Sequence, residues 1–385
     1  MVRKLSNTEG LFLENLRAGL WGEGNSVIRI DGTADWEKIY QLAQEQSVQG
    51  LVLQGIEWFK NHNDNPNLNV NIPKILLLQW IGDVQVIEQR NKEMNAFVAE
   101  LIEKLRKNDI YAILVKGQGI AQCYEIPLWR SCGDVDLLLL SEDYRKAFVL
   151  FRNEAILTSK DKAKNRERLN AEFQVKDWVL ELHGTLHASL SSKMDKVIDS
   201  VQHEVFTEEK VRVWKNGEVD VTIPAPNEDI IFVFSHILQH FFFGGIGLRQ
   251  LCDLCRLLWT YRDSIDQNLL CKRLQKMGVV TEWKVFVALM VEHLGLPAEA
   301  APLYESGYEM KAERALSYTL EVGNFGHNRD SSYLKEKSSI KRKSNILLHQ
   351  MKDSLRLAKI FPIDAWLFFF RTVTDGVKNT ICVWQ

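Results

Sequence analysis

The chain has 385 residues, and its 46% hydrophobic and 25% charged residues are ordinary values for a soluble globular protein. At this length, about two or three structural regions are expected rather than a single core. The net charge of −2 excludes an overall positive field for gripping nucleic acid, and six cysteines without regular spacing favour reduced thiols in a cytoplasmic protein.

Two further features of the chain concern membranes. Residues 1–10 contain no apolar core of a signal peptide. The apolar stretch over residues 230–246 is interrupted by a serine, a glutamine and two histidines, which favours a buried helix over a membrane span. The sequence therefore predicts a cytoplasmic protein without a membrane span.

Residues 1–107 are expected to form a helical region. Apolar residues recur at three- and four-residue spacing over residues 36–46 and 74–107, with few helix breakers. Pro73 suits the start of the second helix, because its missing N–H is not needed there. The asparagine-rich residues 61–71 between the two helices are expected to form a loop.

Residues 108–225 are expected to form a small mixed β-sheet with connecting helices. Apolar runs predict strands over residues 111–115 and 134–140, then one or two strands over residues 172–182, with residues 179–183 the clearest part. A helix is expected over residues 141–153, with Ser141 as its N-cap. Asn216-Gly217, between alternating residues over 211–223, predicts a hairpin.

Residues 226–385 are expected to form a helical domain. Asn227 is a candidate N-cap for a helix over residues 229–243. The glycines within residues 244–247 would separate this helix from another that begins near Leu248.

Three other segments carry weaker signals. Cys252 and Cys255 form a Cys-x-x-Cys within a helix and without a second pair, so buried thiols are expected rather than zinc or redox chemistry. The basic residues 160–168 have interleaved acids and no aromatics, which favours a solvated segment over a nucleic-acid contact. The apolar residues 366–370 are expected to pack as a core or interface helix, with membrane-surface contact as the minor alternative.

The most informative motif is the pair of carboxylates at Asp134 and Asp136. Side chains two residues apart in a strand project from the same face, and the four leucines that follow indicate a buried strand. Two adjacent anions are unfavourable unless a cation lies between them. Mg²⁺ is the usual cation, because it takes one or two carboxylates together with substrate phosphates. The pair therefore predicts phosphoryl or nucleotidyl transfer.

The pair belongs to an ordered set of motifs. The set runs Lys-Gly, Tyr-x-x-Pro, Arg-x-x-Gly-Asp-Val-Asp and Glu-Leu-His, and it occupies residues 116–117, 124–127, 130–136 and 181–183. It resembles a bacterial group known as uncharacterised nucleotidyltransferases, within the polymerase-β-like nucleotidyltransferase superfamily. The resemblance covers about residues 110–190, and the later helical pattern continues over residues 236–253.

The resemblance implies an α+β fold: a nucleotidyltransferase core with a small mixed β-sheet at residues 108–225, flanked by the N-terminal helical region and the C-terminal helical domain. It also implies site residues. The superfamily binds two Mg²⁺ ions with three acidic residues, here Asp134, Asp136 and Glu181, which would be metal ligands and catalytic groups. Mn²⁺ is the alternative cation. The nucleoside triphosphate would be held by eight residues of these motifs and the later helix: Lys116, Gly117, Gly119, Arg130, His183, His236, His240 and Arg249.

One departure concerns the turn, which reads Lys-Gly-Gln-Gly here, whereas the wider superfamily has Gly-Ser and a shorter gap to the aspartates. Several side chains also have structural alternatives. Arg130 could pair with Asp134, and Lys116 could be an ordinary strand-end cation. His236 and His240, four residues apart, suit a shared metal, but core histidines are favoured because the His-Glu-x-x-His motif is missing.

The predicted reaction is Mg²⁺-dependent transfer of a nucleoside monophosphate from a nucleoside triphosphate to an acceptor hydroxyl or phosphate, with release of pyrophosphate. The near-neutral charge favours a small-molecule acceptor over long nucleic acid. Two alternatives stay open. One is a non-catalytic nucleotide-binding or regulatory module on the same fold, and the other is a metallohydrolase centred on His236 and His240. The sequence specifies neither the acceptor nor the oligomeric state.

Overall fold

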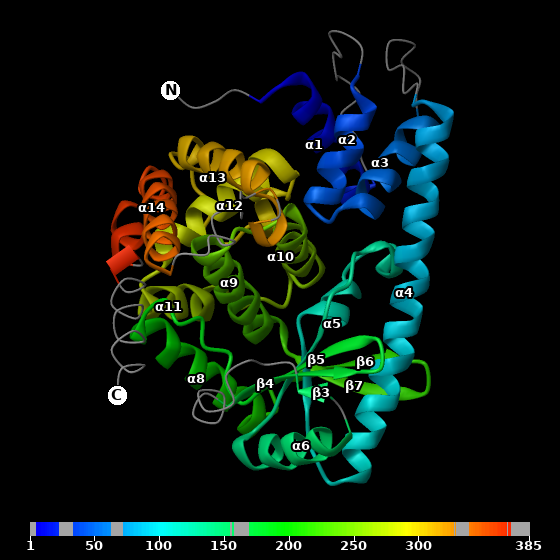
Figure 1. Cartoon of the computed structure of the whole chain (residues 1–385), viewed down its shortest axis with the longest axis vertical. Coiled ribbons are helices and arrows are strands. Elements are labelled where there is room, and N and C mark those ends of the chain that lie inside the picture. Colours follow the sequence, from blue (N-terminus) through cyan, green and yellow to red (C-terminus); the bar gives the residue numbers. More distant parts are fainter. Residues whose placement is uncertain are drawn as a thin grey trace.

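The long helix α4 (Lys74–Lys107) runs along one side of the molecule and joins its two halves (Figure 1). Its apolar stripe changes partner along its length. Trp80 and Val84 pack with the N-terminal helices, whereas Phe97 and Leu101 pack with the sheet. The structure is a computed structural model that describes residues 5–22, 34–62, 72–154, 156–157, 169–326, 328, 339–367 and 369–370.

Three helices precede α4: α1 (Asn7–Trp21), α2 (Trp36–Glu45) and α3 (Gln49–Asn61). Ser6 and Glu9 form a capping box, in which each side chain accepts a hydrogen bond from the backbone N–H of the other residue, and this defines the start of α1. The predicted helices over residues 36–46 and 74–107 are confirmed. The loop predicted over residues 61–71 lies almost entirely outside the described residues.

The central sheet has five strands in the order β1 (Ile113–Val115), β2 (Val135–Leu138), β5 (Trp178–His183), β4 (Asn170–Val175) and β3 (Ile156–Leu157). β2 and β5 are parallel and the other neighbours antiparallel, so the sheet is mixed as predicted. Val135 and Leu137 share a hydrophobic cluster with α4 and with α6 (Ser141–Glu154). Because strand side chains alternate, Asp136 projects from the opposite face.

A separate hairpin, β6 (Val211–Asn216) and β7 (Val219–Pro224), lies beside β1 and α4 (Figure 1). Gly217 adopts a φ of 61° in its turn, which confirms the hairpin predicted from Asn216-Gly217. Three shorter or connecting helices complete this part of the chain: α5 (Gly117–Ala121), η1 (Pro127–Trp129) and α8 (Ser192–Thr207).

The C-terminal part is helical, with α9 (Pro226–Phe243), α10 (Leu248–Thr260), α11 (Gln267–Met277), α12 (Val280–Leu294), η2 (Ala298–Ala300), α13 (Glu309–Val322), η3 (Asn324–Gly326) and α14 (Ser339–Leu357). These helices share one hydrophobic cluster with α1, α2 and α3, so the two helical regions flanking the sheet in sequence meet in space. Cys252 and Cys255 are fully buried in α10, and burial raises the pKa of both thiols, which confirms the expected inert cysteines.

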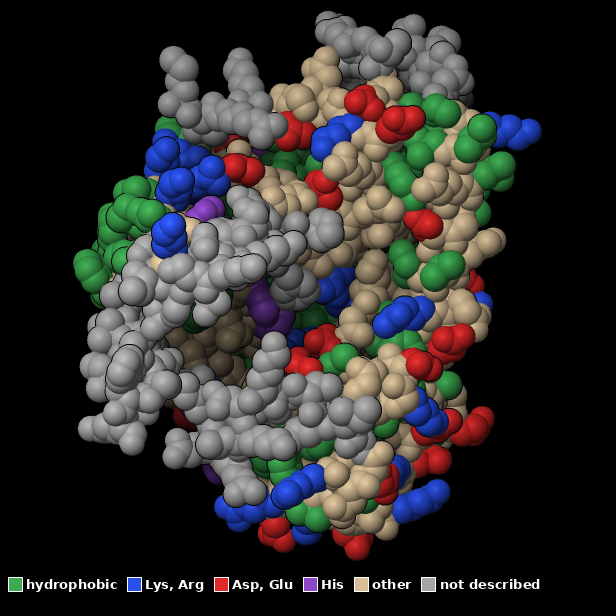
Figure 2. Space-filling view, viewed as in Figure 1, with side chains coloured by type: hydrophobic (Ala, Val, Ile, Leu, Met, Phe, Trp, Pro, Cys, Tyr) green, Lys and Arg blue, Asp and Glu red, His purple; other side chains and the backbone are tan. Residues whose placement is uncertain are grey.

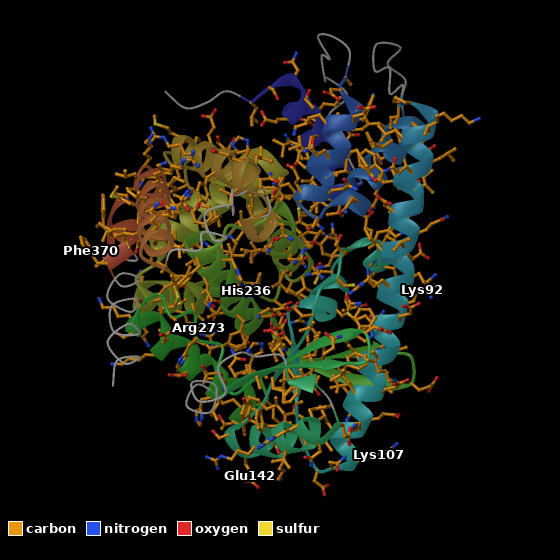
Figure 3. All side chains as sticks on the ribbon, viewed as in Figure 1. Lys92, Lys107, Glu142, His236, Arg273 and Phe370 are labelled. Atoms are coloured by element: carbon orange, nitrogen blue, oxygen red, sulfur yellow. The ribbon has the colours of Figure 1, made fainter. Side chains whose placement is uncertain are left out.

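One prediction in the C-terminal part is wrong. Asn227 does not cap α9, because Pro226 occupies the first helical position and Ala225 the N-cap; Asn227 instead accepts a hydrogen bond from the backbone N–H of Asp266. Of the two alternatives for the apolar run over residues 366–370, the core is excluded: Leu367 is 64% exposed and Phe370, at the outer edge of the molecule in Figure 3, is 61% exposed. The interface alternative stays a prediction.

The α+β class, with small sheets between helical regions, is confirmed. All strands of the described part lie within residues 113–224. The boundaries of the three expected regions stay a prediction. No helix in the described ranges combines the length and apolar character needed to cross a bilayer. The basic stretch over residues 160–168 lies outside them.

Candidate active site

A cavity of about 380 Å³ lies between the sheet and helices α9 and α10. Figure 2 shows this face of the molecule hollowed near its centre, with histidine, acidic and basic side chains gathered there. Ten of the predicted site residues line the cavity: Lys116, Gly117, Arg130, Asp134, Asp136, Glu181, His183, His236, His240 and Arg249. Segments from three distant parts of the sequence therefore meet at one site.

Gly119 is the predicted residue that does not line the cavity. It lies inside α5, where a Cβ atom would come within 3.1 Å of the Ile223 side chain on β7. Its small size is required for the close packing of α5 against the hairpin.

The carboxylates meet because of the strand register. Asp136 pairs with Glu181 across the parallel strands β2 and β5, and both side chains project from the same face. Asp136 is buried, Glu181 is half-buried, and Asp134 stands at the exposed end of β2. The pKa of Asp134 is raised to about 6, first by partial withdrawal from water and then by repulsion from Asp136 and Glu181.

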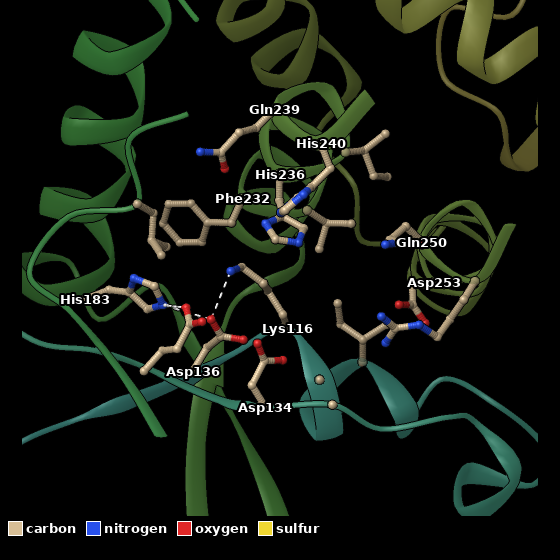
Figure 4. A pocket seen from close by; sticks show the side chains of 18 of the residues that line it. Lys116, Asp134, Asp136, His183, Phe232, His236, Gln239, His240, Gln250 and Asp253 are labelled. Carbon is tan, nitrogen blue, oxygen red and sulfur yellow. Dashed lines mark hydrogen bonds and ion pairs between the residues drawn. The ribbon is translucent and has the colours of Figure 1, made fainter. Parts of the chain in front are cut away.

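The Lys116 ammonium and the His183 imidazole converge on one oxygen of Asp136 (Figure 4). Lys116 Nζ lies 3.0 Å from Asp136 Oδ1, and His183 Nε2 lies 2.8 Å from the same oxygen and 3.2 Å from Glu181 Oε2. Burial alone would raise the pKa of Asp136, but Lys116 and His183 bring it well below the usual range. Burial would lower the pKa of His183, but its hydrogen bonds to both carboxylates raise it.

The backbone at Lys116 has a conformation that few non-glycine residues adopt. Its φ is 59°, and the following Gly117 has a φ of 41°, so two consecutive residues have positive φ between β1 and α5. Such conformations cost free energy and are kept where the surrounding structure requires them. Here the turn brings the Lys116 ammonium over Asp136.

Arg130 forms a bidentate ion pair with Asp253 on α10, with N–O distances of 2.7 Å for both contacts. The Tyr124 hydroxyl also donates to Asp253, at 2.7 Å, and all three side chains are buried. The alternative partner expected for Arg130, Asp134, is therefore wrong. The Arg130 guanidinium joins the segment before β2 to α10 and forms part of the cavity wall.

Arg249 differs from Arg130 in its partners. One terminal nitrogen donates to the backbone carbonyl of Ser131 at 3.3 Å, while the buried Nε atom has no hydrogen-bond partner. Within the described part of the chain, no carboxylate forms an ion pair with it. Burial lowers the pKa of Arg249, with repulsion from Arg130 adding to the effect. A half-buried guanidinium with no acidic partner among the described residues is suited to bind an anion that enters the cavity.

His236 and His240 lie one turn apart on α9, with ring centroids 4.3 Å from each other, and both face the cavity (Figure 4). Burial and the nearby Lys116 lower the pKa of both, that of His240 to about 4, so both imidazoles are neutral at pH 7. Among the described residues, the group of three that could hold a metal contains neither of them.

That group consists of Asp136, Glu181 and His183, whose ligand atoms all lie within 4.8 Å of one another. Two carboxylates and an imidazole fit a divalent cation. Asp134 lies beside this group at the open side of the cavity.

Further lining residues were not predicted. Phe232 and Gln239 stand four before and three after His236, so extending that helix face along the sequence would have found them. Asn170 on β4 and Gln250 on α10 also line the cavity, and no local pattern marks either of them.

The sequence profile of the family described as "Uncharacterised nucleotidyltransferase" matches residues 32–295, which is more than half of the 385-residue chain. The chain therefore belongs to this family, which confirms the resemblance identified from the motifs. The matched range contains every residue that lines the cavity. No curated protein and no solved structure gives a significant match.

Proposed function

We propose that this member of the uncharacterised nucleotidyltransferase family transfers a nucleoside monophosphate from a nucleoside triphosphate to an acceptor hydroxyl or phosphate in the cavity beside β2. One observation carries the proposal. Carboxylates from adjacent strands, Asp136 and Glu181, lie in the same cavity as Arg249, which forms no ion pair with a carboxylate in the part of the chain that the structure describes. The first group suits a metal ion, and the second suits a phosphate.

Asp134, Asp136 and Glu181 would hold Mg²⁺, with Mn²⁺ as the alternative. The donor set fits such an ion, since ligand atoms of Asp136 and Glu181 lie within 4.8 Å of each other and Asp134 lines the same cavity. When bound, the ion would offset negative charge on the transferring phosphoryl group and on the leaving pyrophosphate. The protein would contribute position and charge rather than a covalent intermediate.

Arg249 and Lys116 would bind the phosphates. Arg249 has a buried donor aimed at no protein acceptor, and Lys116 reaches the same cavity from the turn after β1. Gly117, whose positive φ follows that of Lys116, lines the cavity beside them at the start of α5. Arg130, which is committed to Asp253, would fix the position of α10 and thereby of Arg249.

In the transfer step, an acceptor oxygen forms a bond to the α-phosphorus. The bond from that phosphorus to the bridging oxygen breaks, pyrophosphate leaves, and the acceptor proton passes to a carboxylate of the site or to water. The volume of about 380 Å³ suits a nucleotide with a small acceptor group. We therefore propose a small-molecule acceptor rather than long nucleic acid.

The test is to incubate the full chain with each radiolabelled nucleoside triphosphate and Mg²⁺, and to measure pyrophosphate release and nucleotide binding by calorimetry. Asp136→Ala should lower the rate of release at least about 10²- to 10³-fold, because it removes charge stabilisation specific to the reaction. Asp220→Ala is the matched control, since Asp220 forms an exposed ion pair with Lys215 on the hairpin. If the unmodified chain binds no nucleoside triphosphate in the presence of metal, the proposal is wrong.

A non-catalytic nucleotide-binding module is the second candidate function. It is favoured by the contacts of Asp136, whose Oδ1 atom accepts from Lys116 Nζ at 3.0 Å and lies 2.8 Å from His183 Nε2. This candidate predicts nucleotide binding that survives Glu181→Gln, with no pyrophosphate released by either protein.

A further inference from the structure

An imidazole lies among the carboxylates at the end of the cavity. His183 Nε2 is 2.8 Å from Asp136 Oδ1 and 3.2 Å from Glu181 Oε2. His183 is 6% exposed and Asp136 5% exposed, so the nitrogen and its acceptors are largely shielded from water. In this position, His183 is either a hydrogen-bond donor that supports the carboxylates or a metal ligand in its own right.

We propose that His183 is a metal ligand, and that His183, Asp136 and Glu181 form a mixed nitrogen and oxygen site that selects Mn²⁺ over Mg²⁺. Their ligand atoms lie within 4.8 Å of one another, and no other group of three in the described residues meets this condition. Asp134 is absent from that group, so the most compact donor set contains an imidazole in place of the third carboxylate.

The strand geometry fixes this donor set. Glu181 and His183 are two residues apart on β5 and project from the same face. Asp136 on the parallel strand β2 is in register with Glu181, so its side chain lies diagonally from His183 on that face. These positions follow from the backbone and need no rearrangement of either strand.

Lys116 and His183, the two side chains that contact Asp136, differ in what they can offer a metal ion. The charged ammonium of Lys116 has no lone pair, so it must leave or share Asp136 Oδ1 when a cation binds. The imidazole of His183 can lose its proton and remain as a ligand at the same place. Lys116 is then available to a phosphate in the same cavity.

The imidazole determines which ion is preferred. Mg²⁺ is a hard cation that takes oxygen ligands and keeps several waters, whereas Mn²⁺, a transition-metal ion, accepts carboxylate oxygen and binds imidazole nitrogen more readily than Mg²⁺ does. A site with one nitrogen among three protein donors therefore favours Mn²⁺. This inference rests on the proposed function only in that the same ion would serve nucleotidyl transfer.

The direct test is pulsed electron paramagnetic resonance on the metal-free full chain with substoichiometric Mn²⁺ and no nucleotide. The expected result is a ¹⁴N coupling of a metal-bound imidazole in the unmodified protein. His183→Gln should abolish the coupling and weaken Mn²⁺ binding about 10- to 100-fold, while binding of Mg²⁺ in competition changes less. Glutamine can still donate a hydrogen bond to Asp136, so a purely supporting role would leave metal affinity nearly unchanged.

His187→Gln is the matched control, because His187 lines the same cavity but pairs with Asp199 at 2.6 Å. This variant should keep the ¹⁴N coupling, and so should His236→Gln and His240→Gln. If all three variants keep the coupling, His183 is the cavity histidine that supplies the nitrogen, even if His183→Gln does not fold. Mn²⁺ bound without ¹⁴N coupling, or no Mn²⁺ bound at all, overturns the inference. Pyrophosphate release would still be observed in that case if the proposed function is right, whereas ¹⁴N coupling without nucleotide binding would refute the function and keep the metal site.

Discussion

One wall of the cavity is formed by the strands (the strand wall) and the other by helices α9 and α10 (the helical wall). The two walls differ in how many of their polar groups have partners within the protein. On the strand wall, Asp136 and Glu181 have partners within the protein, Lys116 and His183. On the helical wall, His236 and His240 are held neutral and Arg249 keeps a buried Nε atom without a partner. The strand register thus already positions the polar groups of the strand wall. The helical wall keeps a hydrogen-bond donor, Arg249 Nε, that a ligand can use.

A second contrast lies between two arginines of the cavity. Arg130 forms a bidentate ion pair with Asp253, and this pair joins α10 to the segment before β2. Arg249 instead donates one hydrogen bond of 3.3 Å to a backbone carbonyl. The same residue type therefore holds the walls together in one case, and in the other we propose that it binds a ligand. Substitutions of these two residues should separate stability from binding.

The largest expected effect is on stability. Arg130→Met should lower the free energy of unfolding by about 3–5 kcal/mol, because it leaves the buried Asp253 carboxylate without its charge partner. Urea unfolding followed by circular dichroism measures this change. Arg356→Met is the control, since its ion pair with Glu321 is about half exposed, and it should change stability by less than about 1 kcal/mol. Equal losses in the two variants would mean that the Arg130–Asp253 pair does not join the walls.

The residues of the strand wall could be predicted from the sequence because neighbouring residues determine each strand. The two-residue spacing of Asp134 and Asp136 places both side chains on the same face of one strand, and the apolar pattern around Glu181 identifies a second strand. The partner of Arg130 could not be predicted, because Asp253 is 123 residues away in the chain and many carboxylates were available. The choice between core and interface at residues 366–370 was open for a similar reason, since an apolar run shows what a helix can bury but not which partner covers it.

An intermediate effect is expected on nucleotide binding. Arg249→Met should weaken nucleoside triphosphate binding about 10- to 100-fold, which corresponds to one charge-assisted hydrogen-bonded contact. Stability should change little, because Arg249 forms no ion pair with a carboxylate of the described residues. Calorimetry with each nucleoside triphosphate measures the affinity, and Arg356→Met again serves as the surface control. Unchanged affinity in Arg249→Met would place the phosphates elsewhere in the cavity.

The smallest expected effect is a pH-dependent change in stability at Asp134. Its pKa is raised from the usual 3.8 to about 6. Between these two values, Asp134 is protonated in the folded protein and ionised in the unfolded chain. The stabilisation from the protonated form is fully present below pH 4 and is lost as the pH rises through about 6. Asp134→Asn removes the charge, so the variant should match the unmodified protein at pH 4 and be more stable than it at pH 7.5. Thermal unfolding across this range, without added metal, measures the difference. A gap between the two proteins that is constant with pH would show that the pKa of Asp134 is not raised, so neither withdrawal from water nor repulsion from Asp136 and Glu181 would act on it.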